Sequence, residues 1–114
     1  MRTLLSASDD ITALICANDI LATGALLEAQ ATGLGVSADI SIVGMDDLEL
    51  ASHLTPALTT VRVPATEMGE LSARYLIARL KGGRPVMREC LGAELILRGT
   101  TAAPHKRRRS SKRM

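Results

Sequence analysis

The chain has 114 residues, 46% of them hydrophobic and 23% charged, which is typical of one modest soluble globular domain. Tyr75 is its one aromatic residue, so the core must be aliphatic, and aromatic stacking of sugars or bases could involve no other position. The net charge of +2 is uneven, because six of the 14 Lys and Arg residues lie between Lys106 and Arg113. The rest of the chain is mildly acidic, which excludes a basic groove for nucleic acid.

The basic segment 106–113 carries like charges and no apolar residue, which predicts a disordered tail at residues 105–114. The alternative is a basic-tailed interaction module that makes weak, salt-sensitive contacts with nucleic acid. Cys16 lies in an apolar run and is predicted to be a buried thiol, and Cys16 and Cys90 have no metal-type spacing. Neither a signal peptide nor a membrane-spanning apolar run is visible, so we expect a cytoplasmic protein with reduced thiols and no membrane contact.

Apolar runs bounded by turn residues predict strands that alternate with helices. We expect strands at residues 11–17, 39–45, 58–63 and 94–99, and helices at residues 1–10, 20–31, 46–54 and 65–80. The run 11–17 is apolar throughout, which favours a strand buried on both faces. Strands alternating with helices indicate an α/β fold with a largely parallel sheet.

Two polar pairs follow directly after strands, Asn18-Asp19 and Asp46-Asp47. Ligands bind beyond the carboxyl ends of parallel strands, so we expect Asn18 and Asp46 to lie close together at that edge. An amide and a carboxylate there could bind hydroxyls or the polar edge of a base-like ligand. The alternative is that these residues only cap helices, and we expect caps at Asp19 and at Asp46 or Asp47, with Gly33 or Gly35 ending the helix at 20–31.

No catalytic constellation is visible. Adjacent residues leaving a strand usually point in different directions, so an acid/base pair or a metal site at Asp46-Asp47 is disfavoured. His53 is expected at a surface or interface, Thr59 and Thr60 as strand filling, and Arg98 as a partner in an ion pair at a strand end. We therefore expect neither an enzyme nor a bound metal or cofactor.

The order of motifs is more specific than any one motif. "TALICANDILATGALLEAQATGLGVSADISIVGMDD", "PALTTVRVPATEMGELSARYL" and "LRGTT" together resemble the C-terminal third of the lactose/galactose repressor (LacI/GalR) family over roughly residues 11–104. The resemblance implies a bacterial transcription regulator with an N-terminal helix-turn-helix and a two-lobed, type I periplasmic-binding-protein-like effector domain. Effectors of the carbohydrate or nucleoside class would bind between the lobes and change the affinity for operator DNA.

The resemblance also implies roles for individual residues. The family's "AND" asparagine matches Asn18 and the first aspartate of its "G-aromatic-DD" motif matches Asp46, and both contact the effector in several members. Asp19 and Asp47 would then serve the fold. Homodimer contacts are expected from the helix at 20–31 and the segment 48–54, with the interface candidates Thr23, Leu27, Leu50 and Leu54.

The resemblance further implies a division of the chain. Residues 1–63 would be a partial C-terminal lobe, residues 64–92 a crossover helix and connection of the other lobe, and residues 93–104 a returning strand. Met45 replaces a usual aromatic residue, and Ser37 replaces a common proline.

The helix-turn-helix and a complete N-terminal lobe are absent from this sequence, so we expect a truncated fragment that does not bind its operator alone. We also expect an unpaired sheet edge, an apolar helix face at 65–80 that folds back or stays exposed, and a tendency to associate. The alternative, from another functional class, is a fragment of a periplasmic sugar-binding transport protein, which shares the fold.

Overall fold

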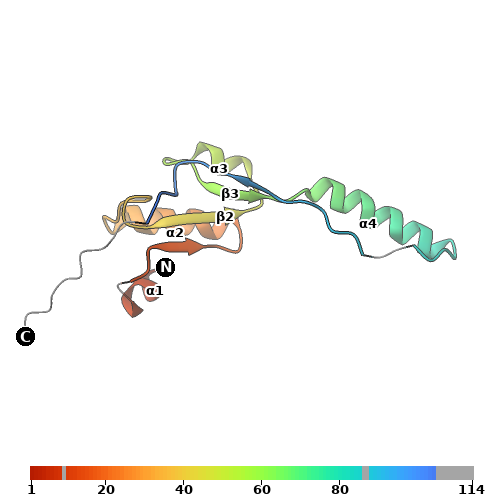
Figure 1. The fold of residues 1–114 in the computed structure, drawn as a ribbon, viewed down its shortest axis with the longest axis horizontal. Helices are drawn as coiled ribbons and strands as arrows, with labels where there is room; N and C mark the ends of the chain where they lie inside the picture. Colours follow the sequence, from red (N-terminus) through yellow and green to blue (C-terminus); the bar gives the residue numbers. More distant parts are fainter. Residues whose placement is uncertain (9, 86–87, 105–114) are drawn as a thin grey trace, which may run out of the picture.

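The computed structural model describes residues 1–8, 10–85 and 88–104, so the expected tail at 105–114 lies outside the described residues. Figure 1 shows a body built on a sheet and one helix that projects away from it. In chain order the elements are α1 (Arg2–Ala7), β1 (Ala13–Ile15), α2 (Asp19–Ala31), β2 (Ser41–Met45), α3 (Glu49–His53), β3 (Thr59–Arg62), α4 (Ala65–Leu80) and β4 (Glu94–Ile96).

The four strands form one sheet in the order β1-β2-β3-β4. β1, β2 and β3 are parallel, with Ile15 opposite Val43, whereas β4 runs antiparallel to β3. The expected α/β fold with a largely parallel sheet is confirmed. The carboxyl ends of β1 and β2 therefore meet at the same edge.

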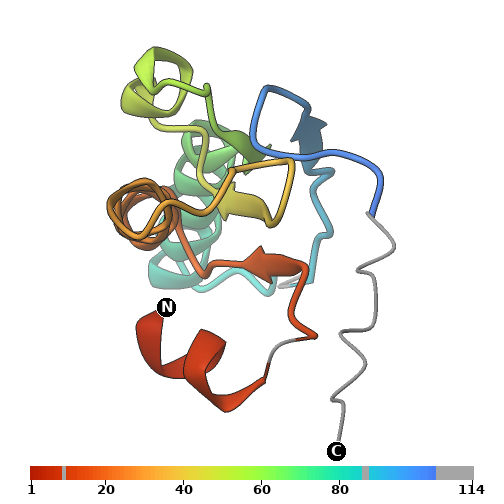
Figure 2. The ribbon, with the colours of Figure 1, turned by 90° about the vertical axis from the view of Figure 1, so that its left-hand side faces the viewer.

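The core lies between the sheet and two helices, α2 and α3, which cover the same side of it (Figure 2). α2 contributes small residues and Leu26, which let the helix approach β2 closely, and α3 contributes Ala51. The buried apolar residues are Ala22, Ala25, Leu26, Ala29, Ile40, Ile42, Ala51 and Leu58. The core is aliphatic, as the composition requires.

The prediction that the first strand is buried on both faces is wrong. Ile15 is 85% exposed and Ala13 is also exposed. β1 is an edge strand among the described residues, and α2 and α3 both cover the opposite face of the sheet. Without a second helical layer the outward side chains of an apolar strand stay in contact with solvent. The expected unpaired edge is present at β1.

The ends of two helices differ from the sequence expectation. Asn18, not Asp19, caps α2, because Asn18 Oδ1 accepts a 2.9 Å hydrogen bond from the Leu21 amide. Neither Asp46 nor Asp47 caps α3, whose first residue follows Leu48 and which has no side-chain cap. Gly33 follows α2 with a φ of +76°, which confirms one of the two glycines expected to end that helix.

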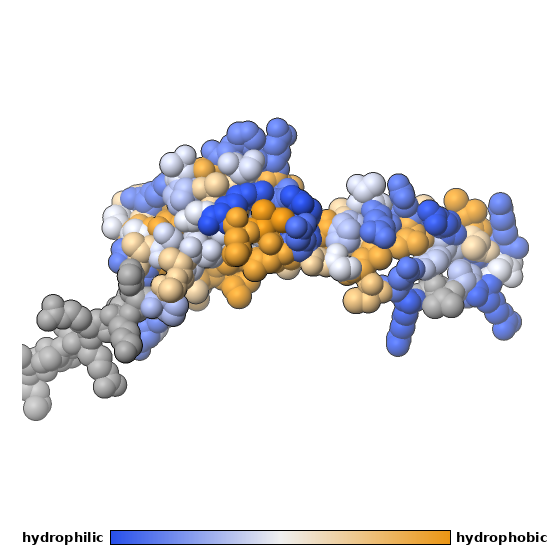
Figure 3. All heavy atoms as spheres, turned by 45° about the horizontal axis from the view of Figure 1, so that its top comes forward, coloured by the Kyte–Doolittle hydropathy of each residue, from blue (hydrophilic) through white to orange (hydrophobic). Residues whose placement is uncertain are grey.

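α4 projects from the body, and the described molecule measures 73 × 31 × 23 Å. No residue of α4 is buried, and its apolar side chains Met68, Leu76, Ile77 and Leu80 are about half exposed or more. Figure 3 shows apolar side chains exposed between charged ones along α4, the projecting arm of the molecule. Of the two expected outcomes for this face, the structure shows the exposed one. The expected tendency of the chain to associate stays a prediction.

Asp19 is a buried carboxylate that connects α2, β3 and the loop after β2. It lies at the edge of the sheet where the parallel strands end. Its Oδ1 accepts a 2.6 Å hydrogen bond from the Thr60 hydroxyl on β3, and its Oδ2 accepts a 2.8 Å bond from the Leu48 amide. Gly44 of β2 packs directly against it, because a β-carbon at Gly44 would overlap Asp19 Oδ1. These contacts fix the start of α2 over the end of β2 and beside β3.

An ion-pair cluster, formed by Asp47, Arg62, Glu94 and Arg98, joins the end of β2 to β3 and β4. Asp47 Oδ1 lies 2.6 Å from Arg98 Nη2, and Asp47 Oδ2 lies 2.8 Å from Arg62 Nε. Arg62 Nη1 also lies 3.1 Å from Glu94 Oε2. The hydrogen bond from Arg98 is the main cause that lowers the pKa of the Asp47 carboxyl, and Arg62 acts in the same direction against the effect of burial. The expectation for Arg98 is confirmed.

Substituting Gly44 tests the close approach of α2 to β2. A Gly44→Ala substitution forces a methyl group against Asp19 and Leu58 Cδ2, so it should lower the free energy of unfolding by about 1–3 kcal/mol or more. Gly24→Ala in the middle of α2 is the matched control, since nothing lies within 4 Å of the added β-carbon. That control should stabilise the helix by up to about 1 kcal/mol. Urea unfolding followed by circular dichroism measures both, and equal effects would contradict the packing argument.

Acid should weaken the Asp47 cluster. Because the folded pKa of Asp47 is lowered, its contribution to stability is present above the unfolded pKa of about 4 and is lost as the pH falls through the folded value. At pH 7 Asp47→Asn should therefore be less stable than the parent chain, and the difference should narrow well below about pH 4. Urea midpoints at pH 7 and pH 3 measure this difference. A difference that is the same at both pH values would show that ionisation of Asp47 contributes nothing.

Candidate functional site

Asn18 and Asp46 occupy equivalent places at the carboxyl edge of two neighbouring parallel strands. Ile15 and Val43 are opposite each other in the sheet, and Asn18 and Asp46 each follow by three residues. The pairing continues past β1, since the Cys16 amide donates to the Val43 carbonyl at 2.8 Å. The parallel pairing of the two strands that lead to these positions is confirmed, whereas the closeness of Asn18 to Asp46 and their contact with a ligand stay predictions.

Asn18 has two functional groups with different surroundings. Its side-chain oxygen accepts from the Leu21 amide, which holds the side chain at the start of α2. The side-chain amide nitrogen makes no hydrogen bond to the described residues. Asn18 is half-buried, so this nitrogen is a donor fixed in position at the sheet edge. The cap and the ligand interpretations of Asn18 are therefore compatible.

Asp46 is exposed and has an unusual backbone conformation. Its φ is +106°, and Asp47 after it has a φ of +53°. Conformations of this kind are rare for residues other than glycine, cost about 1–3 kcal/mol, and cluster at functional sites. The Asp46 amide donates to the Val61 carbonyl at 2.9 Å, so the backbone is tied to β3 while the carboxylate faces solvent.

Sequence reasoning missed the hydrogen-bonding roles of several buried polar residues. Thr60 was expected only to fill a strand, yet it is fully buried and donates to Asp19. Thr100 is also fully buried, where its hydroxyl donates to the Ile42 carbonyl at 2.6 Å and accepts from the Thr59 amide at 2.9 Å. The "LRGTT" motif was the available signal for Thr100, because two threonines after a strand can replace ladder hydrogen bonds.

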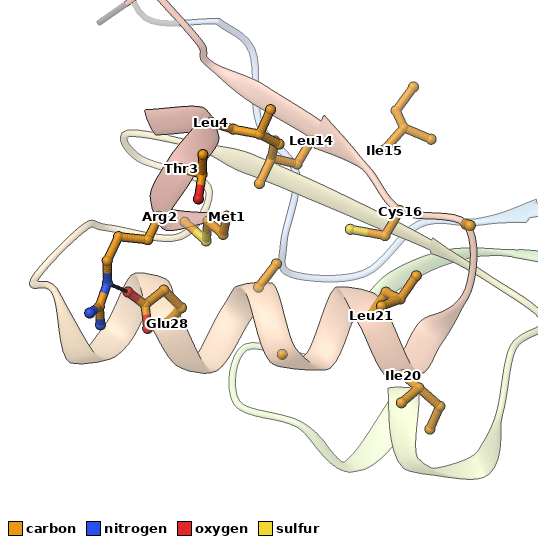
Figure 4. A pocket seen from close by; sticks show the side chains of 13 residues that line it. Met1, Arg2, Thr3, Leu4, Leu14, Ile15, Cys16, Ile20, Leu21 and Glu28 are labelled. Carbon is orange, nitrogen blue, oxygen red and sulfur yellow. Dashed lines mark hydrogen bonds and ion pairs between the residues drawn. The ribbon is translucent and has the colours of Figure 1, made fainter. Parts of the chain in front are cut away.

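A hollow of about 650 Å³ opens between α1, β1 and α2. Figure 4 shows apolar side chains, among them Leu4, Leu14 and Leu21, around this hollow, and the Arg2–Glu28 ion pair of 2.7 Å at its rim. That ion pair lowers the pKa of Glu28. Neither Asn18 nor Asp46 lines the hollow, so the hollow is separate from the sheet edge at which these two residues lie.

Cys16 lines the same hollow and is half-buried rather than fully buried as expected. It follows the exposed edge strand β1, which explains why solvent still reaches it. Partial burial raises the pKa of its thiol. A raised pKa makes the reactive thiolate form scarce.

The four expected interface residues lie on the two helices of one layer and the turn after α3. Leu27 on α2 and Leu50 on α3 are 56% and 47% exposed. Thr23 is half-buried and its hydroxyl donates to the Asp19 carbonyl at 2.7 Å, and Leu54 packs partly against the core. Leu27 and Leu50 are therefore the two with side chains available to a partner.

Two further sequence expectations concern metal and membrane. Among residues 1–8, 10–85 and 88–104 no group of three or more His, Cys, Asp or Glu side chains is arranged to hold a metal ion. His53 is exposed, and its Nδ1 lies 2.9 Å from the Glu49 carbonyl oxygen. No helix in the described part of the chain has the length and hydropathy needed to cross a bilayer.

Comparison with known proteins places the chain among bacterial regulators. Residues 2–101 match the profile of the periplasmic binding protein-like domain. The chain is 43% identical over 103 residues to the HTH-type transcriptional regulator MalR of Streptomyces coelicolor, a match that covers 88% of this chain and 30% of MalR. It is 41% identical over 81 residues to the ribose operon repressor of Haemophilus influenzae, which covers 71% of this chain and 25% of that repressor.

Solved structures agree with these relatives. A complex of the transcriptional regulator CelR with cellobiose matches 87% of this chain and 31% of that chain, with 34% identity and a TM-score of 0.81. The lac repressor dimer bound to operator and the anti-inducer ONPF matches 81% of this chain and 32% of that chain, with 38% identity and a TM-score of 0.74. The chain spans about 30% of the length of the first of these relatives.

The named relatives are transcription regulators rather than enzymes or transport proteins. The fold, the order of the strand-end motifs and the matched residues 2–101 all agree with that group. The chain therefore belongs to the LacI/GalR family of transcription regulators and is part of its periplasmic-binding-protein-like domain.

Proposed function

We propose that this chain supplies one side of an effector site in a LacI/GalR-type regulator, with Asn18 and Asp46 as the ligand contacts. The observation that carries the proposal is Asp46 itself, an exposed carboxylate with a φ of +106° at the sheet edge that Asn18 shares. Strain of this kind persists only where surrounding structure imposes it, and function is the usual reason.

The chemistry of the two side chains favours a small polyhydroxylated ligand. A carboxylate accepts hydrogen bonds from hydroxyl groups, and the Asn18 amide nitrogen donates one. Bonds to a charged carboxylate are the stronger kind, each contributing about 1.5–3 kcal/mol. A relative was solved with cellobiose and another is a ribose operon repressor, which supports a carbohydrate effector and leaves nucleosides as the second class.

The proposed division of the chain follows from its connections. Residues 1–63 would form part of one lobe, 64–92 with α4 would belong to the other lobe, and 93–104 would return to the first. The apolar side chains of α4 support this division, because Met68, Leu76, Ile77 and Leu80 stay about half exposed or more and no residue of the helix is buried. The second half of the effector contacts would come from the part of a longer protein that this sequence does not contain.

In the full regulator, the effector would act by shifting populations. A ligand that binds one arrangement of the lobes better than the other favours that arrangement in proportion to its differential affinity. The dimer would transmit the change to helix-turn-helix domains outside this sequence, which would bind operator DNA in the cytoplasm. The relative solved as a dimer on its operator supports this arrangement.

The dimer contacts would be Thr23, Leu27, Leu50 and Leu54. Leu27 and Leu50 are the exposed apolar members of this set and lie on neighbouring helices that cover the same side of the sheet. Apolar side chains on a helical layer of this kind are what a partner surface buries. Leu54, which contacts the core, and Thr23, which is bonded to its own helix, would complete the surface at its border.

Ligand binding can be tested on the chain by NMR titration with cellobiose, ribose and adenosine. We expect one of the three to shift the Asn18 side-chain amide signals and the Asp46 backbone amide. Asp46→Asn keeps the size of the side chain but removes its charge, so it should weaken binding at least about tenfold, or about 1.4 kcal/mol. A panel in which no compound shifts these signals would contradict the proposed ligand classes.

Asn18→Asp separates the ligand role of Asn18 from its role as a cap. Aspartate and asparagine are equally good caps, so the stability of α2 should hold while the amide donor is lost. We expect affinity to fall about tenfold at unchanged urea midpoint. Asp39→Asn is the control, because that carboxylate accepts from the Gly35 amide in the loop before β2 and should leave affinity unchanged.

The dimer surface can be tested by sedimentation velocity. Leu27→Glu and Leu50→Glu each place a charge in the proposed interface and together should reduce association at least about tenfold, since an unpaired buried charge costs several kcal/mol. Leu76→Glu on α4 is the matched control, with a side chain that is 61% exposed in the described chain. If the chain with both Leu27→Glu and Leu50→Glu still associates but the Leu76→Glu chain does not, the interface lies on α4 instead.

A further inference from the structure

We infer that Asp47 is a positioning residue for Asp46, and that its pairing with Arg62 and Arg98 fixes the loop at Asp46–Leu48 to both chain segments that connect the body to α4. The inference rests on the proposed function, because the position of the Asp46 carboxylate matters for ligand binding only if Asp46 contacts the ligand. The positioning itself depends on contacts within this chain alone.

The Asp47 side chain is held from two sides. It is only 9% exposed, and each of its oxygens faces a different arginine, Oδ1 at 2.6 Å from Arg98 and Oδ2 at 2.8 Å from Arg62. An ionised carboxylate with both oxygens engaged by guanidinium groups has a strongly preferred orientation. Because Asp47 directly follows Asp46, fixing its side chain restricts the backbone on which Asp46 stands.

The loop needs such a restraint because its backbone is strained. Asp46 and Asp47 are consecutive residues with φ values of +106° and +53°, and no glycine is present to relieve them. Hydrogen bonds from backbone amides restrain the loop on both sides of Asp47, from the Asp46 amide to the Val61 carbonyl and from the Leu48 amide to Asp19. The two ion pairs add the restraint on the Asp47 side chain, so Asp46 would relax toward an ordinary φ if they were lost.

The two arginines come from the two connections between the body and α4. Arg62 is the last residue of β3, which leads into α4, and Arg98 lies two residues after β4, which returns from it. Arg98 is also anchored to the body, because its Nη1 donates to the Leu58 carbonyl at 2.9 Å and its backbone amide to the Thr59 hydroxyl at 3.0 Å. Glu94 of β4 contacts Arg62 from the other side.

This arrangement has a consequence for any motion of α4. A displacement of β3 or β4 changes the position of Arg62, and with it the restraint on Asp47 and Asp46. A ligand that contacts Asp46 would in turn favour the arrangement in which the arginines are in place, because coupling between two sites is reciprocal. The Asp47 ion-pair cluster is thus the physical connection between the ligand edge and the arm.

Amide hydrogen exchange of the full chain tests the inference without a ligand. The Asp46 amide bonded to Val61 reports on the loop, and the Cys16 amide bonded to Val43 reports on the neighbouring strand. We expect Asp47→Asn to lower the protection of Asp46 at least about tenfold and that of Cys16 less than about twofold. A purely structural role would lower both in parallel, and that outcome, or an unchanged Asp46, would overturn the inference.

Arg62→Gln supplies a second variant that should fold, because the Arg62 side chain is half exposed. It should lower the protection of Asp46 about threefold, since Arg98 still holds one oxygen of Asp47. Combined with Asp47→Asn it should add nothing, because both changes remove the same contact. Additive effects in this double-mutant cycle would overturn the coupling through Asp47.

Asp39→Asn is the matched control for losing a carboxylate that holds a loop. Its Oδ2 accepts a 2.7 Å hydrogen bond from the Gly35 amide before β2, so the protection of Gly35 should fall while that of Asp46 holds. Since exchange is measured without ligand, failure of the proposed effector site would show in the titrations alone. Failure of the positioning role would show in the exchange of Asp46 alone.

Discussion

The buried carboxylate of Asp19 is the interaction on which the rest of the site depends. Its two oxygens bind a hydroxyl from β3 and an amide from the loop after β2, while its own helix begins at the end of β1. One side chain therefore fixes three chain segments at one edge of the sheet. Gly44 is required beside it because the space that a side chain would need is filled by the carboxylate. Burial of a charged group is tolerable here because both oxygens have donors.

With that edge fixed, neighbouring residues have separate tasks. At the first junction Asn18 caps the helix with its oxygen and presents its nitrogen, while Asp19 turns inward. At the second junction Asp46 is exposed, while Asp47 turns toward two arginines. In each pair one residue stabilises the loop and the other is left with a polar group facing solvent. A ligand site built in this way gains rigidity from residues that need not contact the ligand.

The sequence predicted the strands and helices from apolar runs, and it predicted the polar edge because parallel strands place their carboxyl ends together. It could not assign the caps, since local rules accept asparagine and aspartate equally at the start of a helix. The choice depends on Thr60, 41 residues away, which binds Asp19. The solvent exposure of β1 could not be predicted from its apolar residues, because burial depends on what covers the outer face of the sheet. The hydrogen bonds of Thr100 depend on a strand pairing that no local pattern specifies.

The charged cluster around Asp47 explains why a strained loop and an exposed helical arm occur in the same chain. Backbone strain at Asp46 raises the free energy of the folded state unless other contacts offset it, and the ion pairs that offset it come from β3 and from the segment after β4. A loop restrained by its own strand alone would keep one conformation whatever α4 did. A loop restrained by β3 and by the segment after β4 has a conformation that depends on where the arm lies. The loop is also held from the core, where the Leu48 amide donates to Asp19, and the added restraint from the two connections is what allows this sheet edge to respond to a distant part of the molecule.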